Sequence, residues 1–387
     1  MKITGYRLEH YPYTLDRPLA DCNYPAGNYV MHGSLLFIDT DEGLTGLAPM
    51  GGANVESLFH LIEGEDPRGV VGLWMKMNDY LHKGGNRGAA TGAIAAIDVA
   101  LWDLKAKIAD EPLWQTLGAR EGRVKAYASG IAYSLADDEL FAFYRRMAEQ
   151  GIDSAKVKVG LDLEDDRRRL GAVHEALSIA SPRPRLMIDS NEYWSPKQAV
   201  RYINSLEEDF DLTWVEEPAR RWDYDGLRLV SQQVSAAVAT GENLNTIADF
   251  YPLIANQAVD MVNISAAFAG FTGCRQVGHM AHAYELPVTM MNCQANFMAH
   301  MAAALPNHSM MEVVDPGREH CIRFGHTIED GFIHLSDDPG LGLEIDTEKL
   351  AELQANPPDQ PSIFPFPRRE GAGLYIAPLE PGEVSWR

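Results

Sequence analysis

The apolar and polar positions divide the chain into regions of different secondary structure. The first ~50 residues predict strands, because β-branched and aromatic residues gather there in short runs. In "SLLFIDTDEGLTGLAP", Asp41-Glu42-Gly43 separate two apolar runs and predict a hairpin turn. From about residue 55 the spacing is helical. "TGAIAAIDVALWDLKAKIADEPLWQTLG" keeps this spacing until Asp110-Glu111-Pro112 ends it, so the N-terminal part is α+β.

After residue 123 short apolar runs alternate with helical stretches. The eight runs are "VKAYASG", "AKVKVG", "RLMIDSN", "LTWVEEP", "AAVATGEN", "VDMVNIS", "LPVTMMN" and "SMMEVV". The stretches between them include "DDELFAFYRRMAEQG", "DDRRRLGAVHEALSIA", "SPKQAVRYINSLEE" and "TGCRQVGHMAHAYE". This rhythm predicts a parallel sheet, and eight strands are the number that closes a TIM-type (β/α)₈ barrel. An open, doubly wound sheet is the competing interpretation.

The expected organisation is therefore an α/β fold with two parts. Residues 1–123 would form an α+β capping domain and residues 124–325 the barrel with the catalytic site. Residues 326–387, which include a proline-rich extended tail, would return to the capping domain. The glycine-rich stretch 83–92 has no strand before it and lacks the spacing of a nucleotide-binding turn, so it is expected to be a plain loop.

Composition narrows the choice of partner. Lys and Arg total 33 against 55 for Asp and Glu, and the net charge of -22 argues against nucleic acid or an anionic membrane. It does not argue against a small anionic substrate, which needs only a local basic pocket. The four cysteines lack zinc spacing and do not resemble a disulfide scaffold. With no signal peptide and no apolar run near the ~18 residues of a membrane span, a soluble, cytoplasmic protein is expected.

Three of the predicted strands end in an acidic residue: Asp189, Glu216 and Glu242. They lie 27 and 26 residues apart, about one strand–helix unit each. Active sites of barrels lie at the C-terminal ends of the strands, where three converging carboxylates repel one another unless a cation lies among them. Oxygen ligands without nearby Cys or His favour Mg²⁺ over zinc. Taken singly, each acid could also be a helix cap or an ion-pair partner.

Alternation decides between the two glutamates of "WVEEP". Trp214 and Glu216 share one face of the strand, and Val215 and Glu217 share the other. Glu216 is therefore assigned to the metal, and Glu217 to a supporting or structural ion pair.

Lys156 and Lys158 lie two apart in a short buried strand, "AKVKVG", so both side chains point to the same side. Two close ammonium groups lower each other's pKa, which predicts a neutral lysine able to act as a base near pH 7. A metal and a lysine base together can remove a proton α to a carboxylate. The alternative is a pair of lysines at an exposed strand end.

These motifs together resemble the enolase superfamily, and within it the mandelate racemase and muconate lactonizing enzyme family. "AAIDVALWDLKAK", "KVK", "MIDSN", "WVEEP" and "TGEN" carry the resemblance over nearly the whole chain, and Glu242 in "GEN" is closest to the mandelate racemase subgroup. The resemblance implies a capped barrel, one Mg²⁺ per subunit, an enolate intermediate and a homo-oligomer between dimer and octamer. By motif, Lys158 would be the base with Lys156 beside it, and Asn191, Asn243 and the eighth-strand Glu312 would contact the substrate.

One feature of that subgroup is missing. Its sixth and seventh strands usually end in an Asp and a His, which act on the opposite face of the substrate. Here Ile264 or Ser265 occupies the sixth-strand position, and Asn292, or Met291 if the alignment shifts by one, occupies the seventh. Asn292 is expected to contact the substrate. The muconate-type lysine of the sixth strand is missing too.

Several residues could replace the missing acid. His32 and Tyr24 lie in the loop region that covers the site in this family, and Cys293 and Tyr133 are further candidates. Other polar residues are expected to have different roles. The histidines in helical stretches would be packing or surface residues: His279, His282 and His300. Two arginines, Arg220 and Arg221, could bind a distal carboxylate of the substrate.

Without that pair, elimination is favoured over racemisation, because exchange on both faces of a carbon needs two groups. The leading hypothesis is a Mg²⁺-dependent dehydratase of an acid sugar, an aldonate or aldarate, that gives a 2-keto-3-deoxy acid. A racemase, epimerase or cycloisomerase is the alternative, followed by a catalytically silent acid-binding protein. Specificity is expected to lie in the loops near residues 15–32 and 80–90.

Overall fold

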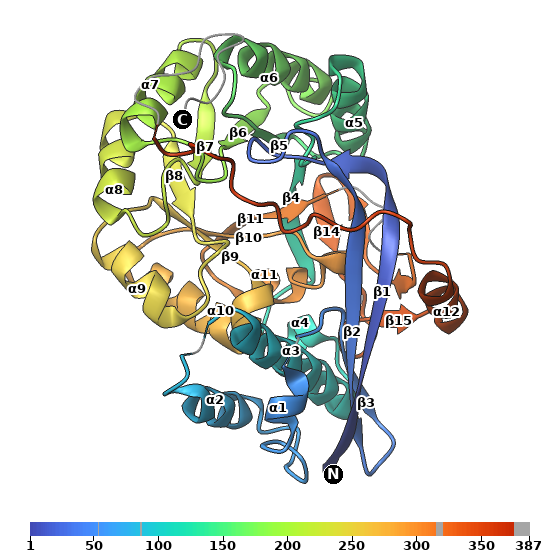
Figure 1. The fold of residues 1–387 in the computed structure, drawn as a ribbon. Helices are drawn as coiled ribbons and strands as arrows, with labels where there is room; N and C mark the ends of the chain where they lie inside the picture. Colours follow the sequence, from blue (N-terminus) through green and yellow to red (C-terminus); the bar gives the residue numbers. More distant parts are fainter. Residues whose placement is uncertain (53, 86, 315–319, 375–387) are drawn as a thin grey trace.

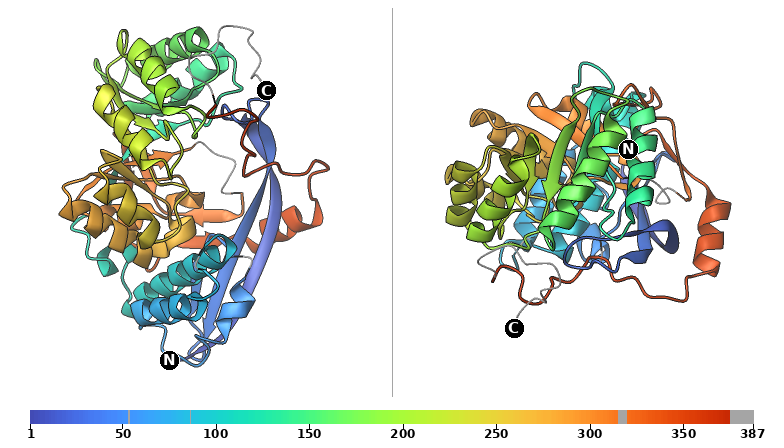
Figure 2. Two further views of the ribbon diagram at one scale, coloured as in Figure 1. Left: turned by 60° about the vertical axis from the view of Figure 1, so that its left-hand side comes forward. Right: turned by 90° about the horizontal axis from the view of Figure 1, so that it is seen from above.

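A computed structural model places a long antiparallel sheet beside a closed barrel (Figures 1 and 2). It describes residues 1–52, 54–85, 87–314 and 320–374, without the side chains of 266–269. The sheet has the order β1 (Ile3–Leu19), β2 (Asn28–Thr40), β3 (Thr45–Ala48). The predicted hairpin turn at 41–43 is confirmed, since the amide of Gly43 donates to the carbonyl of Thr40 at 3.2 Å.

Helices beside the sheet complete the capping domain: α1 (Val55–Phe59), α2 (Val70–Leu81), α3 (Ala89–Ala109) and α4 (Leu113–Thr116). The first turn of α3 takes up the end of the glycine-rich stretch 83–92. The predicted stop after α3 is confirmed. Asp110 adopts a left-handed conformation with φ 55°, and Pro112, which has no amide proton, follows two residues later.

Eight parallel strands close into a barrel, because the last strand pairs with the first. They coincide with the eight apolar runs of the sequence, so the closed barrel is confirmed over the open sheet. In chain order they are β4 (Arg123–Ser129), β5 (Ser154–Lys158), β6 (Arg185–Asp189), β7 (Leu212–Glu216), β8 (Ala237–Thr240), β9 (Met261–Ile264), β10 (Val288–Met290) and β11 (His308–Val313). Aromatic and methionine side chains such as Tyr127, Met187 and Trp214 fill the interior below the carboxyl ends.

Helices follow seven of these strands on the outside of the barrel (Figure 2). They are α5 (Asp137–Glu149), α6 (Leu163–Leu177), α7 (Pro196–Glu207), α8 (Tyr224–Gln233), α9 (Ile247–Ala255), α10 (Ala266–Ala283) and, after the 3₁₀ turn η1 (Gln294–Asn296), α11 (Ala299–Ala304). Within the described residues, β11 is instead followed by short strands. These are β12 (Ile322–Phe324), β13 (Thr327–Glu329), β14 (Phe332–His334) and β15 (Leu343–Ile345).

The segment after residue 325 contacts both parts of the molecule. β14 pairs antiparallel with β4 and so extends the barrel sheet, whereas α12 (Thr347–Ala355) packs against β1. Residues 361–374, here called the C-terminal strap, then cross the open face of the barrel (red in Figure 1). The predicted extended tail on the capping domain therefore also reaches the barrel. Among the described residues, no helix is both long and apolar enough to cross a membrane.

Candidate active site

The two lysines of β5 point into the barrel, as alternation predicted. Lys156 is 1% exposed and Lys158 7%. The Lys156 ammonium lies 2.6 Å from a carboxylate oxygen of Glu216 and 3.0 Å from one of Glu312. The Lys158 ammonium donates to Asp189 at 2.5 Å. The pair is therefore surrounded by acids rather than exposed at a strand end.

Strand register brings the predicted acids together. Lys158 pairs with Asp189 between β5 and β6, and Asp189 pairs with Glu216 between β6 and β7. Strand β8 ends at Thr240, and Gly241, whose φ is 138°, connects it to Glu242. A side chain at residue 241 would place its Cβ 2.4 Å from the Asn263 carbonyl oxygen, so only glycine lets the chain turn there.

A cavity of about 220 Å³ opens at this end of the barrel. Six of the residues predicted for the site contribute to its wall: Lys158, Asn191, Glu242, Asn243, Asn292 and Glu312. The wall also includes residues that were not expected there from the sequence, from the capping loop, two strand ends and the strap: Asp21, Asn23, Glu192, Glu217, Phe366 and Arg368.

The electrostatics of the lysines differ from the expectation. Burial lowers the pKa of Lys158 and Lys156 lowers it further, but Asp189, Glu242 and Asp21 together raise it above its usual value. Burial likewise opposes the charge of Lys156, yet Glu216 and Glu312 raise its pKa well above the usual value. The two lysines do oppose each other's charge, but the expected net lowering of the lysine pKa is wrong, because the acids on neighbouring strands outweigh the like-charge repulsion.

The three predicted ligands differ in their electrostatics. Burial opposes the charge of Asp189, but Lys158 and Lys156 lower its pKa below the usual value. Burial raises the pKa of Glu216 to about 8, and Asp189 and Glu242 add to this shift although Lys156 opposes it. Burial and the charge of Asp189 also raise the pKa of Glu242. These buried, mutually repelling carboxylates form a donor set of hard oxygens that suits Mg²⁺, which would remove the repulsion.

The three carboxylates do not surround one position of the size of a metal ion. Among the described residues, no group of three His, Cys, Asp or Glu side chains does so. Glu216 is turned to Lys156, Asp189 to Lys158, and Glu242 to the side-chain amide of Asn243 at 3.0 Å. Rotation of these side chains, rather than movement of the strands, would be needed for them to share a cation. The chemical type of the donors, and their origin on three neighbouring strand ends, fit the ion.

Glu217 was expected on the opposite face of its strand from Glu216, but the structure places it at the cavity. It is 1% exposed and lines the cavity, where it accepts a hydrogen bond from Asn243 at 2.9 Å. Strand β7 ends at Glu216, and Glu217 has a left-handed backbone with φ 46°. Alternation holds only within a strand, so the next residue can turn its carboxyl into the same cavity.

The asparagines and Glu312 lie where they could meet a substrate. Glu312 accepts from the backbone amide and the side chain of Asn292, at 3.0 and 2.7 Å. Asn243 donates to both Glu217 and Glu242. The side-chain oxygen of Asn191 is buried without a hydrogen-bond partner among the described residues, which makes it available to a ligand.

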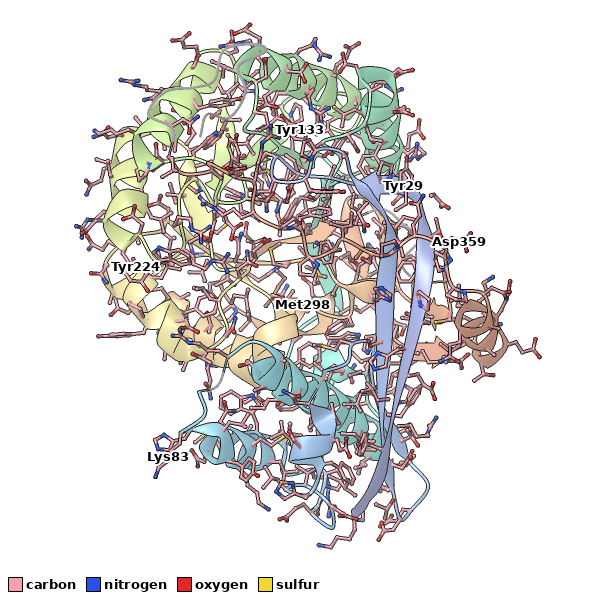
Figure 3. All side chains as sticks on the ribbon, viewed as in Figure 1. Tyr29, Lys83, Tyr133, Tyr224, Met298 and Asp359 are labelled. Carbon is pink, nitrogen blue, oxygen red and sulfur yellow. The ribbon has the colours of Figure 1, made fainter. Side chains whose placement is uncertain are left out.

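The acid candidates named from the sequence lie outside this wall. His32 is exposed on β2 and, with Cys293, lines a neighbouring groove of about 430 Å³. The Tyr24 ring stacks on Phe366, with centroids 5.5 Å apart. Tyr133, labelled in Figure 3, packs over α6, where the Arg169 guanidinium lies 5.3 Å from its ring.

The remaining candidates divide between surface and structure. His279 and His282 are exposed on α10 and His300 is buried in α11, as expected for surface and packing residues. Arg220 and Arg221 do line the cavity, but both bind the buried carboxylate of Glu192, at 3.1 and 2.6 Å. This ion pair neutralises much of their charge.

Sequence reasoning missed Asp21 as a candidate acid. It lies in the loop between β1 and β2, is 7% exposed and lines the cavity. Its carboxylate accepts from the backbone amides of Asn23 and Tyr24, at 2.7 and 3.0 Å. Burial raises its pKa, although Lys158 lowers it. The only sequence signal was its position in the loop region expected to cover the site.

Comparison with known proteins agrees with this geometry. Residues 32–118 match the family described as "Mandelate racemase / muconate lactonizing enzyme, N-terminal domain", and residues 139–349 match "Enolase C-terminal domain-like". The chain belongs to the mandelate racemase / muconate lactonizing enzyme family. The resemblance to this family, and through it to the enolase superfamily, is thereby confirmed.

Two relatives from this family have names that describe enzymes of acid sugars. The 3,6-anhydro-alpha-L-galactonate cycloisomerase of Streptomyces coelicolor is 31% identical, with 82% of this chain and 90% of the relative covered. The L-talarate/galactarate dehydratase of Salmonella typhimurium is 32% identical, with 76% and 73% covered. Both reaction types therefore occur among relatives at similar distance.

Solved structures of the family superpose over most of the chain. A racemase from Streptomyces coelicolor with bound magnesium has a TM-score of 0.83 and 30% identity, covering 91% of this chain and 99% of its own. The L-talarate dehydratase of Polaromonas sp. JS666, complexed with Mg and L-glucarate, has a TM-score of 0.80 and 29% identity, covering 90% and 96%. Family members thus bind magnesium and a small acid.

Proposed function

We propose that this protein is a Mg²⁺-dependent dehydratase of an acid sugar, an aldonate or aldarate. The observation that carries this proposal is that a lysine, Lys158, and a buried carboxyl group, Asp21, line the same cavity. The Cys22 thiol donates to the Ser190 carbonyl at 3.1 Å, so the loop of Asp21 lies over the ends of β5 and β6. The strands across the barrel carry Met291 and Asn292, which are poor proton-transfer groups.

The proposed reaction removes the elements of water from one face of the substrate. Lys158 takes the α-proton in its neutral form, which requires that the Asp189 charge that raises its pKa first be neutralised. The electron pair of the broken C–H bond moves into the carboxylate to give an enediolate. The β-carbon–oxygen bond then breaks, and Asp21 gives its proton to the departing hydroxyl, which leaves as water. The resulting enol ketonises to a 2-keto-3-deoxy acid.

Other residues of the chain hold the substrate for this reaction. Asp189, Glu216 and Glu242 would hold one Mg²⁺, which would supply positive charge beside the substrate carboxylate as it gains electron density. Glu312, held in place by Lys156 and Asn292, would accept a hydrogen bond from a substrate hydroxyl. Asn191 would donate to or accept from a second hydroxyl.

A cycloisomerase is the second candidate, and the relative from Streptomyces coelicolor favours it. The same lysine and the same enediolate would serve. The leaving oxygen would be part of a ring, so that it stays attached and the product is an isomer of the substrate.

The test is incubation of the purified protein with Mg²⁺ in D₂O and a panel of aldonates, aldarates and anhydro-aldonates. Dehydration gives a semicarbazide-reactive product that has lost one water and taken up deuterium at C3. A keto product that keeps this oxygen and differs from the substrate only by deuterium would instead show a cycloisomerase, and deuterium at the α-carbon of an otherwise unchanged acid would show a racemase or epimerase. Absence of all three changes would contradict enolate chemistry in this protein.

A further inference from the structure

Glu242 is the one of the three proposed metal ligands that lies outside the regular pairing of the barrel strands. Asp189 and Glu216 are the last residues of β6 and β7, and they pair with each other in the barrel register. Glu242 instead follows Gly241, beyond the end of β8. The hydrogen bonds between strands that fix the other two acids therefore do not hold its main chain. Another anchor is needed if its carboxylate is to meet a cation in a defined position.

Arg221, in the loop after β7, provides such an anchor. Its Nη1 atom donates to the main-chain carbonyl of Asn243, the residue after Glu242, at 3.1 Å. The side-chain amide of Asn243 donates in turn to Glu217 at 2.9 Å and to Glu242 at 3.0 Å. Asn245 adds a longer hydrogen bond to the same carbonyl, at 3.3 Å. The guanidinium thus holds the residue whose side chain orients the carboxylate of Glu242.

Glu192, in the loop after β6, holds the guanidinium in place. The Nε atom and the backbone amide of Arg221 donate to the same oxygen of Glu192, at 2.6 and 3.1 Å. Glu192 is 3% exposed, and its own backbone amide donates to the Glu217 carbonyl at 2.9 Å. The network therefore joins the loops after β6, β7 and β8. A guanidinium suits this position because its donors are fixed in one plane and can reach two acceptors at once.

Arg220, the preceding residue, makes a different set of contacts. It also binds Glu192, at 3.1 Å, but its guanidinium lies over the exposed ring of Trp222, 4.0 Å from the ring centroid. Within the described part of the chain, its side chain makes no hydrogen bond to the loop after β8. The two arginines therefore have the same charge and share one carboxylate, but differ in their contact with Asn243.

We propose that Arg221 is a positioning residue for the binding of Mg²⁺, because it fixes the main chain beside Glu242 through Asn243. This inference rests on the proposed function for the identity of the ion. It predicts an effect opposite in sign to that of charge alone. A nearby cation repels Mg²⁺, so removal of its charge would by itself strengthen binding. Loss of the positioning contact should instead weaken binding.

The test measures the affinity for Mg²⁺ and needs no turnover. The full-length protein is freed of metal with EDTA, dialysed, and titrated calorimetrically with MgCl₂ at constant pH and ionic strength. Arg221→Lys keeps the charge and Arg221→Gln removes it. Both should weaken Mg²⁺ binding about 10- to 100-fold, the usual effect of altering a group that holds a metal ligand. Arg220→Lys, the matched control, should keep the native affinity. Thermal unfolding of each metal-free variant checks that it is folded.

Glu192→Gln provides a second route, because it loosens Arg221 without altering it. It should also weaken Mg²⁺ binding. The double variant with Arg221→Gln should bind Mg²⁺ no more weakly than Arg221→Gln alone, since both changes break the same connection. Fully additive losses would mean that the two residues act on the ion independently, which contradicts the proposed network.

The outcomes separate this inference from the proposed function. Unchanged or tighter Mg²⁺ binding in either Arg221 variant, or an equal loss in Arg220→Lys, overturns the role of Arg221 and leaves the dehydratase untouched. Mg²⁺ binding that depends on Arg221, in a protein that releases no product from the acid panel, supports Arg221 and contradicts dehydration. If the native protein binds no Mg²⁺, both proposals are wrong.

Discussion

At the residue scale, Lys158 and Asp21 would divide the work of proton transfer in the proposed reaction. Lys158 is fixed by its hydrogen bond to Asp189, whereas Asp21 is fixed by two backbone amides of its own loop. Each is thus held by different contacts and can be altered separately. If Lys158 removes the α-proton and Asp21 protonates the leaving group, loss of either should stop a different step.

The first prediction compares Lys158→Ala with Asp21→Asn. Lys158→Ala should lose both dehydration and exchange of the α-proton with D₂O, because no base remains. Asp21→Asn should lower the dehydration rate about 10²- to 10⁴-fold, the usual contribution of a general acid, while α-proton exchange continues. The readouts are product formation and deuterium content of recovered substrate, by mass spectrometry.

Tyr133→Phe is a suitable control, since this phenol packs over α6 and should be dispensable. Full turnover in Lys158→Ala would refute the assignment of the base. Loss of exchange together with dehydration in Asp21→Asn would show that Asp21 acts on the first step, for example by positioning Lys158.

At the element scale, the contact between α3 and α10 ties the capping domain to the barrel. The Asp98 carboxylate on α3 accepts from the backbone amide and hydroxyl of Thr272 on α10, at 2.8 and 2.5 Å. Trp102, one turn further along α3, donates to the same hydroxyl at 3.0 Å. Asp98 is fully buried, and this burial raises its pKa to about 7.

The second prediction follows from that pKa. An unfolded aspartate titrates near pH 4. Between pH 4 and about pH 7 the folded protein therefore binds more protons at Asp98, so the free energy of unfolding falls as the pH rises through this window. Asp98→Asn should remove up to about 4 kcal/mol of this pH dependence. Urea unfolding of both proteins at several pH values measures it.

Asp110→Asn is the control for that experiment, because Asp110 is exposed at the end of the same helix and asparagine tolerates its left-handed backbone. It should reproduce the native pH dependence. An Asp98→Asn protein with the native slope would mean that the Asp98 carboxyl does not titrate in this window. The contribution would then belong to another buried acid, such as Asp166 on α6, whose pKa burial also raises to about 7.

At the scale of the whole molecule, the cavity is assembled from distant segments. The barrel strands supply the lysine and acids, the loop after β1 supplies Asp21, and the strap supplies Arg368. The core of the site is a cluster of buried carboxylates whose repulsion opposes folding. A ligand that binds the folded cluster and not the unfolded chain must stabilise the whole fold.

The third prediction concerns that ligand. Mg²⁺ should raise the thermal midpoint and EDTA should reverse the increase, with about 2.7 kcal/mol of added stability at roughly 100 times its Kd. Glu242→Gln should abolish this dependence on Mg²⁺ without requiring any measurement of activity. Glu348→Gln, which removes an exposed acid on α12, should keep it. Equal stabilisation of both variants would contradict a role for Glu242 in binding the ion.

The sequence by itself determined the barrel strands, the shared side of the two lysines and the acids at the strand ends. These are local properties, because a period of two fixes which side chains point inward and each strand carries its own apolar run. Repetition of the strand–helix unit then implied that the acids converge. The resemblance to a known family rested on the same motifs.

Only the tertiary structure decided which residues complete the site. Asp21 and Arg368 are separated by most of the chain and line one cavity because the strap crosses the barrel mouth. Glu217 enters the cavity through one left-handed backbone angle, and the charge balance at Lys158 depends on acids from neighbouring strands. These properties arise from contacts between segments, and no periodicity within one segment encodes them.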